Sequence, residues 1–114
     1  MSAVGVYSDM KFVETPVFTK ALRAAIPDEE YRTLQAALLL RPEQGPLIPG
    51  TYGLRKIRWG GKGHGKRGGY RVIYYWDDKS ETFYMLFIYP KNDQEDLTSQ
   101  QTRTLAELVR KEFR

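Results

Sequence analysis

Three strand-like stretches decide the fold: LRKIRW (residues 54–59), YRVIYYWD (70–77) and TFYMLFIY (82–89). They are rich in β-branched and aromatic residues, which favour strands. Asp77-Asp78-Lys79-Ser80 is a plausible hairpin turn between the last two. The spacing therefore predicts three consecutive strands in meander order.

Helical patterns lie on the N-terminal side of these strands, after a short strand predicted over Lys11–Glu14. Thr15 is a suitable N-cap, and Pro16 fits the first helical position. Pro27 ends this first helix, and a second amphipathic helix continues to Pro42. The two helices form a predicted hairpin.

A last amphipathic helix is predicted after Thr98, which forms a capping-box pattern with Gln101. The predicted order is β-α-α-β-β-β-α. We expect an α+β domain with a small, mostly antiparallel sheet, an N-terminal helical hairpin and a C-terminal helix. The helices are expected to pack on one face of the sheet and to leave the other face open.

The composition is that of a globular protein, with 114 residues, 41% hydrophobic and 28% charged. We expect one domain over residues 1–114, of which 1–10 form a flexible N-terminal extension. The absence of cysteine excludes a disulfide framework and favours a reducing compartment. No apolar run is long enough to span a bilayer, and no signal peptide is recognised, so we expect a cytoplasmic protein with no membrane partner.

Positive charge is concentrated in one part of the chain. Residues 54–71 contain seven of the 18 basic residues, no acidic residue and six of the ten glycines. The rest of the chain is therefore mildly acidic. A local positive field attracts polyanions, and glycines allow a backbone or a flat ligand to approach closely.

The alternation of the first strand places Lys56 and Arg58 on one face and Ile57 with Trp59 on the other. Arg71 on the paired strand is expected to lie beside the two cations. Aromatic residues are interleaved with this basic surface, which favours single-stranded RNA as a ligand through stacking and phosphate contacts. Packing within the sheet is the alternative interpretation of these rings.

Other chemical motifs are weaker. Gly60–Lys66 has the spacing of a phosphate-binding P-loop, but Arg67 follows where Ser or Thr is required, and a strand follows where a helix is required. One histidine, His64, and the carboxylates at Asp93, Glu95 and Asp96 are too few for a metal site. We expect no metal and no cofactor.

The chain resembles the RelE/HigB group of bacterial type II toxins over nearly its whole length. The resemblance is carried by residues 12–18, 53–59, 65–75, 88–92 and 96–98. It implies the RelE-like fold and a metal-independent mRNA endonuclease that acts in the ribosomal A site. It also implies a cognate antitoxin, expected to be a HigA-like helix-turn-helix protein. The toxin would contact operator DNA only through this antitoxin.

The resemblance also implies roles for individual residues. Lys56, Arg58, Arg71 and Lys91 correspond to catalytic positions, whereas Asn92 stands where the best-known RelE members have an arginine, and no tyrosine follows near Leu97. Candidates for the general base remain open between Lys56, Tyr89 and His64. The predicted RNA-binding residues are Lys62, Lys66, Arg67, Tyr70 and Tyr89.

Two other functions remain open at this stage. One is a non-catalytic RNA-binding module whose basic groove only holds its ligand. The other is a toxin of the same fold that acts on DNA gyrase, which would not need the three clustered cations.

Overall fold

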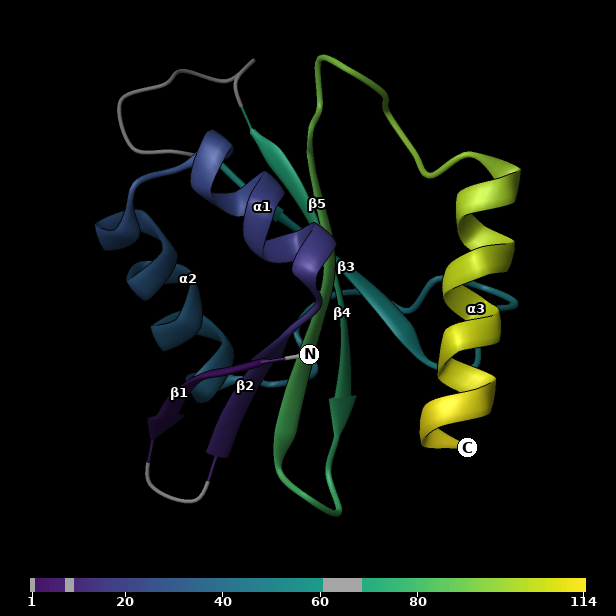
Figure 1. Ribbon diagram of the computed structural model, residues 1–114, viewed down its shortest axis with the longest axis horizontal. Coiled ribbons are helices and arrows are strands. Elements are labelled where there is room, and N and C mark those ends of the chain that lie inside the picture. The colour runs from purple at the N-terminus through teal and green to yellow at the C-terminus, as the bar shows by residue number, and fades with distance from the viewer. Residues whose placement is uncertain (1, 8–9, 61–68) are drawn as a thin grey trace.

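The computed structural model describes residues 2–7, 10–60 and 69–114. The described residues form five strands and three helices (Figure 1). In chain order these are β1 (Ser2–Tyr7), β2 (Met10–Glu14), α1 (Pro16–Ala25), α2 (Asp28–Leu40), β3 (Leu54–Trp59), β4 (Tyr70–Asp77), β5 (Thr82–Pro90) and α3 (Ser99–Phe113). The predicted α+β class is confirmed, as is the predicted order from β2 onward.

The five strands form one mixed sheet in the order β1-β2-β5-β4-β3. β2 pairs with β5 in parallel, and the other neighbours pair antiparallel. The β3–β4–β5 meander is therefore present as predicted. The parallel β2–β5 pair is possible because α1, α2 and two further strands separate these elements along the chain.

β1 was not expected, because residues 1–10 were predicted to be a flexible extension. Residues 2–7 instead form a strand that pairs with β2 from Ser2 opposite Glu14 to Tyr7 opposite Met10. Without β1, β2 would be an edge strand with unpaired backbone groups. Pairing at this edge explains how a stretch with little strand-like periodicity joins the sheet.

Local capping signals act as predicted at both ends of the fold. The Thr15 hydroxyl accepts a hydrogen bond from the Phe18 N–H at 2.9 Å and donates one to the Leu86 carbonyl at 3.1 Å. Thr98 and Gln101 form the complete capping box of α3. Thr15 therefore begins α1 and also ties it to β5.

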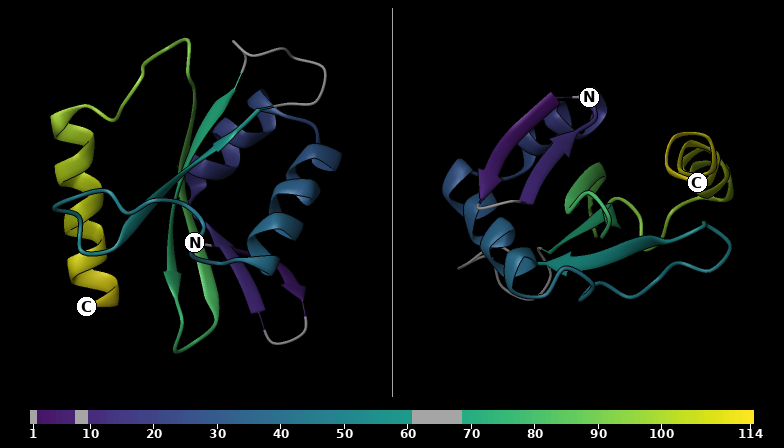
Figure 2. Two further views of the ribbon diagram at one scale, coloured as in Figure 1. Left: turned by 180° about the vertical axis from the view of Figure 1, so that it is seen from behind. Right: turned by 90° about the horizontal axis from the view of Figure 1, so that it is seen from below.

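The helices cover both faces of the sheet, which corrects the expectation of one open face. α1 and α2 lie on one side of the central strands and α3 lies on the other (Figures 1 and 2). The first core includes Phe18, Leu34 and Tyr74, and the second joins Leu54 and Ile73 to Val109 of α3. Successive side chains of the central strands point alternately into the two cores, so both faces of the sheet are buried.

No helix within the described part of the chain is long and apolar enough to cross a membrane.

Candidate active site

Four of the predicted site residues lie together on the α3-facing side of the sheet. Arg58 of β3 is opposite Arg71 of β4, which in turn is opposite Tyr89 of β5. Directly paired residues share a face, and Lys56 shares it because it lies two residues before Arg58. We call Lys56, Arg58 and Arg71 the cation cluster. The predicted convergence of these residues follows from the register.

The segment that joins β5 to α3, residues 91–98, brings two carboxylates to the cluster. The Lys56 Nζ lies 2.7 Å from Asp96 Oδ1, and the Arg71 Nη2 lies 3.4 Å from Glu95 Oε2. Arg58 is exposed and makes no ion pair with a described residue. On the open sheet face expected from the sequence, Lys56 and Arg71 would be solvated and unpaired. They are ion-paired because the chain folds back over this end of the sheet.

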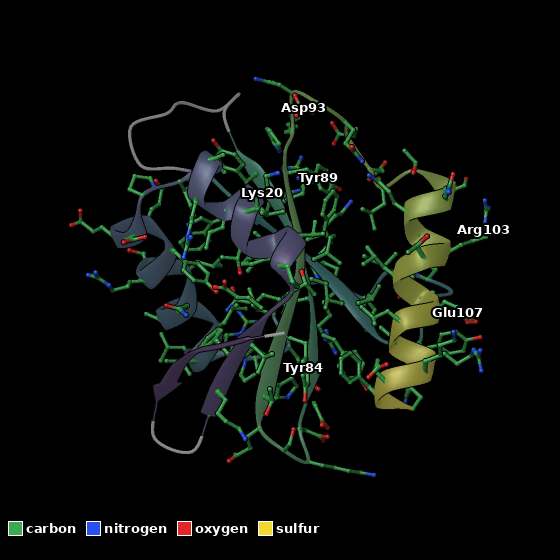
Figure 3. The ribbon with its side chains drawn as sticks, in the orientation of Figure 1. Lys20, Tyr84, Tyr89, Asp93, Arg103 and Glu107 are labelled. Atoms are coloured by element: carbon green, nitrogen blue, oxygen red, sulfur yellow. The ribbon has the colours of Figure 1, made fainter. Side chains whose placement is uncertain are left out.

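Arg71 and Tyr89 are buried beneath this segment, with exposed fractions of 4% and 3%. Tyr89 lies on the side of β5 that faces α3 (Figure 3). The Arg71 Nε and the Tyr89 hydroxyl have no hydrogen-bond partner among the described residues. A buried polar atom without a partner costs free energy, so these two atoms mark hydrogen-bonding capacity that the described residues leave unused.

Burial also determines the protonation of Tyr89. It raises the pKa of the phenol above its ordinary value of 10.0, and the charges of Asp96 and Glu95 raise it further against the opposing effect of Arg71. At neutral pH the Tyr89 hydroxyl therefore holds its proton and can donate a hydrogen bond.

The pKa of Asp96 is shifted in the opposite direction. The hydrogen bond from Lys56 and the charge of that ammonium group lower it below its ordinary value of 3.8, and Arg71 and Arg58 lower it further. Asp96 is therefore a carboxylate at neutral pH, and 71% of its side chain is exposed to solvent.

Among the other predicted site residues, Tyr70 lies on the opposite face of the sheet from the cluster. Tyr70 shares a face with Trp59, packs against the α1–α2 core and donates a hydrogen bond to the Ala25 carbonyl at 2.9 Å. Lys91 is exposed, and its side chain has no hydrogen bond or ion pair with a described residue. Lys62, His64, Lys66 and Arg67 lie outside the described residues.

One cation of the basic stretch has a structural role. The Arg55 Nη1 donates to the carbonyls of Glu43 and Gly45 at 2.9 and 2.8 Å. Arg55 alternates with Lys56 and so lies on the opposite face of β3. It holds the loop between α2 and β3 in place.

A cavity of about 250 Å³ adjoins the cluster. Lys56 and Asp96 form its polar wall, and the remaining wall consists of residues 46–49, Leu97 and Thr102. It is open to solvent at a place where two charged groups meet an apolar surface. These features suit one ring-shaped, partly polar group.

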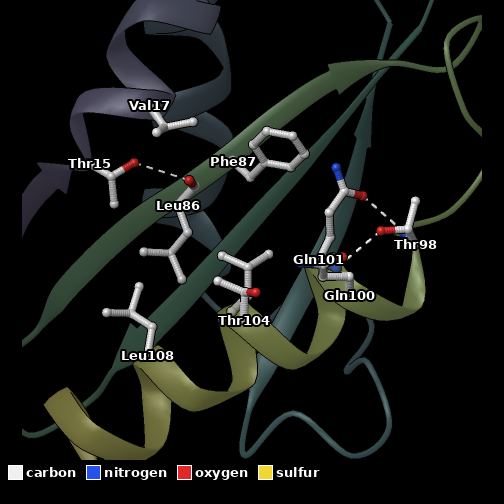
Figure 4. A pocket seen from close by; sticks show the side chains of 10 residues that line it. Thr15, Val17, Leu86, Phe87, Thr98, Gln100, Gln101, Thr104 and Leu108 are labelled. Carbon is white, nitrogen blue, oxygen red and sulfur yellow. Dashed lines mark hydrogen bonds between the residues drawn. The ribbon is translucent and has the colours of Figure 1, made fainter.

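A larger groove of about 450 Å³ lies between the start of α1, β5 and α3 (Figure 4). Its walls include Val17, Leu86, Phe87 and Leu108, and no charged residue lines it. A phosphate group would find no cation there. The smaller cavity beside Lys56 and Asp96 is therefore the better candidate for chemistry on a polyanion.

Glu95 and Asp96 are the site residues that sequence reasoning missed. On the sequence alone, they were considered only as members of a group too small for a metal site. Their signal was their position between a strand that ends beside Arg71 and a helix that packs on the same face. A segment that makes this connection must pass the cations.

Together, the fold and the site define a small α+β protein with a partly buried cluster of cations on the sheet. The protein-family model for the RelE toxin of the RelE/RelB toxin-antitoxin system matches residues 10–113. The chain therefore belongs to this family.

Two solved structures share the fold. A structure of an Escherichia coli RelE mutant in the free state matches with a TM-score of 0.55 and 15% identity, over 85% of this chain and 93% of that one. The intact E. coli RelBE toxin-antitoxin complex matches with a TM-score of 0.50 and 17% identity, over 68% of this chain and 90% of the matched chain.

Proposed function

We propose that this chain is the toxin of a type II toxin-antitoxin system and acts as a ribosome-dependent endoribonuclease. It cleaves mRNA in the ribosomal A site and thereby inhibits translation. The observation that carries the proposal is the row of Arg58, Arg71 and Tyr89 across three strands, with Lys56 beside it. Membership of the RelE toxin family supports the same activity.

The chemistry needs fixed positive charge. In metal-independent RNA cleavage the 2′-oxygen attacks the adjacent phosphorus, and negative charge develops on the non-bridging oxygens. Lys56, Arg58 and Arg71 stabilise that charge, and the unpartnered Arg71 Nε and Tyr89 hydroxyl offer two more donors. Lys91, which follows β5 directly, supplies a further charge to the RNA, as do Lys62, Lys66 and Arg67.

Replacement of Lys56 tests the proposal directly. Lys56→Ala should lower the rate of mRNA cleavage by about 10² to 10³. Thermal stability should change little, because an ion pair with an exposed carboxylate contributes only about 0–1 kcal/mol. Cleavage is measured by mapping mRNA 5′-ends in a translating extract.

Lys79→Ala is the matched control, because it removes the same charge from the exposed turn between β4 and β5. It should cleave like the wild type. Equal cleavage by Lys56→Ala and the wild type would place the active site elsewhere.

The same experiment separates two alternatives. A non-catalytic RNA-binding module would leave mRNA intact while it binds ribosomes or message. A toxin that acts on DNA gyrase would leave mRNA intact and relax or break DNA instead. The clustered cations favour RNA over gyrase as the target. The buried donors of Arg71 and Tyr89, which have no partner among the described residues, favour binding of the transition state over binding of intact RNA.

The proposed partners are the ribosome, mRNA and a cognate antitoxin with a HigA-like helix-turn-helix domain. A structure of the related E. coli RelBE complex supports an antitoxin partner. Acidic antitoxin segments would cover the exposed cations, and apolar ones would cover the groove of Figure 4.

Co-expression with the neighbouring open reading frame should restore growth and yield a complex, whereas growth without arrest by this chain alone would contradict its toxicity. A cytoplasmic location follows from these partners.

A further inference from the structure

RNA cleavage by a 2′-oxygen requires a proton acceptor, which the cation cluster does not supply. This inference rests on the proposed function. As the O2′–P bond forms, the 2′-hydroxyl proton must leave, and as the P–O5′ bond breaks, the 5′-oxygen must gain a proton. Arginine side chains hold their protons throughout the accessible pH range. Arg58 and Arg71 therefore cannot accept the 2′-hydroxyl proton.

Two of the candidate bases from the sequence are also unsuitable. Lys56 donates a hydrogen bond to Asp96 at 2.7 Å, and an ammonium group in that contact carries its proton. Tyr89 is a protonated phenol at neutral pH, because burial and the nearby carboxylates raise its pKa. Both groups can donate a proton, and neither is free to take one.

Two carboxylates remain among the described residues at the cluster. Glu95 faces the buried guanidinium of Arg71. Asp96 faces Lys56 and keeps an exposed carboxylate edge, with 71% of its side chain accessible to solvent. Asp96 is therefore deprotonated, accessible and in contact with a proton donor.

The adjoining cavity brings substrate to the same atoms. Lys56 and Asp96 form one wall of a space of about 250 Å³ whose other walls are largely proline and aliphatic side chains. This space is large enough for one nucleobase. A nucleotide seated there with its ribose against the polar wall would direct its 3′-phosphate toward the cations.

We propose that Asp96 is the general base of the reaction and that the cavity beside it seats the nucleotide whose 2′-hydroxyl attacks. The Asp96 carboxylate accepts the 2′-hydroxyl proton as the O2′–P bond forms. Lys56 gives a proton to the 5′-oxygen as the P–O5′ bond breaks. Asp96 then returns its proton to Lys56 through their hydrogen bond, so that both groups regain their starting states. The products are a 2′,3′-cyclic phosphate and a 5′-hydroxyl.

The test compares Asp96→Asn with Asp93→Asn on purified ribosomes programmed with a defined message. Both variants remove one carboxylate from the same segment, and Asp93 lies near the tip of that segment, away from the cluster (Figure 3). Single-turnover cleavage should fall by about 10² to 10⁴ in Asp96→Asn and remain at the wild-type rate in Asp93→Asn. Asp96→Glu should retain part of the activity. Binding of a non-cleavable 2′-deoxy message should be unchanged or tighter in Asp96→Asn, because one negative charge is lost.

The pH dependence gives a second readout. The groups that face Asp96 are the cations Lys56, Arg58 and Arg71, together with Tyr89 and Glu95. The pKa of Asp96 is lowered and that of Tyr89 is raised, so Asp96 stays a carboxylate and Tyr89 keeps its proton around neutral pH, and the wild-type rate should be flat between about pH 5.5 and about pH 8. If His64 were the base, the rate would fall about tenfold per pH unit below about pH 6.5.

The other outcomes either overturn the inference or decide whether a loss of cleavage is caused by misfolding. Wild-type cleavage by a folded Asp96→Asn variant excludes Asp96 as the base, and faster cleavage identifies it as a shield over the cations. A melting temperature equal to that of the wild type excludes misfolding as the cause of a loss. Absence of cleavage by the wild type itself would overturn the proposed function, and with it this inference.

Discussion

Arg71 combines a structural cost with a proposed functional role. Arg71 is 4% exposed, its Nε has no partner among the described residues, and it forms an ion pair with Glu95, whose side chain is 60% exposed. Replacement of a poorly compensated buried charge by an apolar side chain of similar length is often neutral or stabilising. The proposed phosphate binding would account for a buried charge that stability alone does not explain.

We predict that Arg71→Met leaves the free energy of unfolding unchanged or raises it by about 1 kcal/mol. The same variant should lower mRNA cleavage by about 10² to 10³, because a donor to the transition state is lost. Urea denaturation and single-turnover cleavage measure the two effects. A loss of more than about 2 kcal/mol would instead show that the guanidinium supports the fold.

The loop between α2 and β3 depends on one tyrosine of β4. The buried Tyr74 hydroxyl donates to the Pro42 carbonyl at 2.8 Å and accepts from the Gly45 N–H at 3.0 Å. Glycine suits position 45, because a Cβ there would lie 3.0 Å from the tyrosine ring and hydroxyl, which is closer than an ordinary contact. The loop then continues into residues 46–49, which form one wall of the cavity beside Lys56.

Tyr74→Phe should lower the free energy of unfolding by about 1 to 3 kcal/mol, because the buried Gly45 N–H and the half-buried Pro42 carbonyl lose their partner. Urea denaturation measures this loss. Tyr84→Phe is the matched control, since that hydroxyl is not fully buried and makes no hydrogen bond with a described residue. Equal stability of the two variants would mean that water replaces the Tyr74 contacts.

The whole molecule should lose stability in alkaline solution. Burial raises the pKa values of Tyr74 and Tyr89 above 10.0 in the folded state. The unfolded chain therefore releases these phenolic protons first. The contribution of both groups is fully present below pH 10 and is lost as the pH rises through their folded values.

Urea denaturation at about pH 8 and about pH 11 should show this loss in the wild type. Tyr74→Phe and Tyr89→Phe should each reduce the difference between the two pH values, because each variant has one fewer buried phenol to ionise. An unchanged difference in both variants would assign the alkaline loss to other groups, such as the lysines.

Much of the fold was predictable because its signals are local. Thr15 and Thr98 cap helices through bonds to residues three positions away, which sequence spacing reveals. The alternation of β3 likewise predicted that Lys56 and Arg58 share a face. The placement of Arg71 beside them needed only the β3–β4 hairpin register. The sequence by itself thus determined the elements, their order from β2 onward and the three cations of the site.

Only the tertiary structure decided how distant parts meet. Periodicity shows that α3 has an apolar face, but not which side of the sheet receives it, and α3 packs opposite α1 and α2. That choice carries residues 91–98 across the end of the sheet, where Glu95 and Asp96 meet Arg71 and Lys56. Such contacts depend on the path of the chain between elements. No local pattern encodes that path, because both faces of the sheet offer apolar surface.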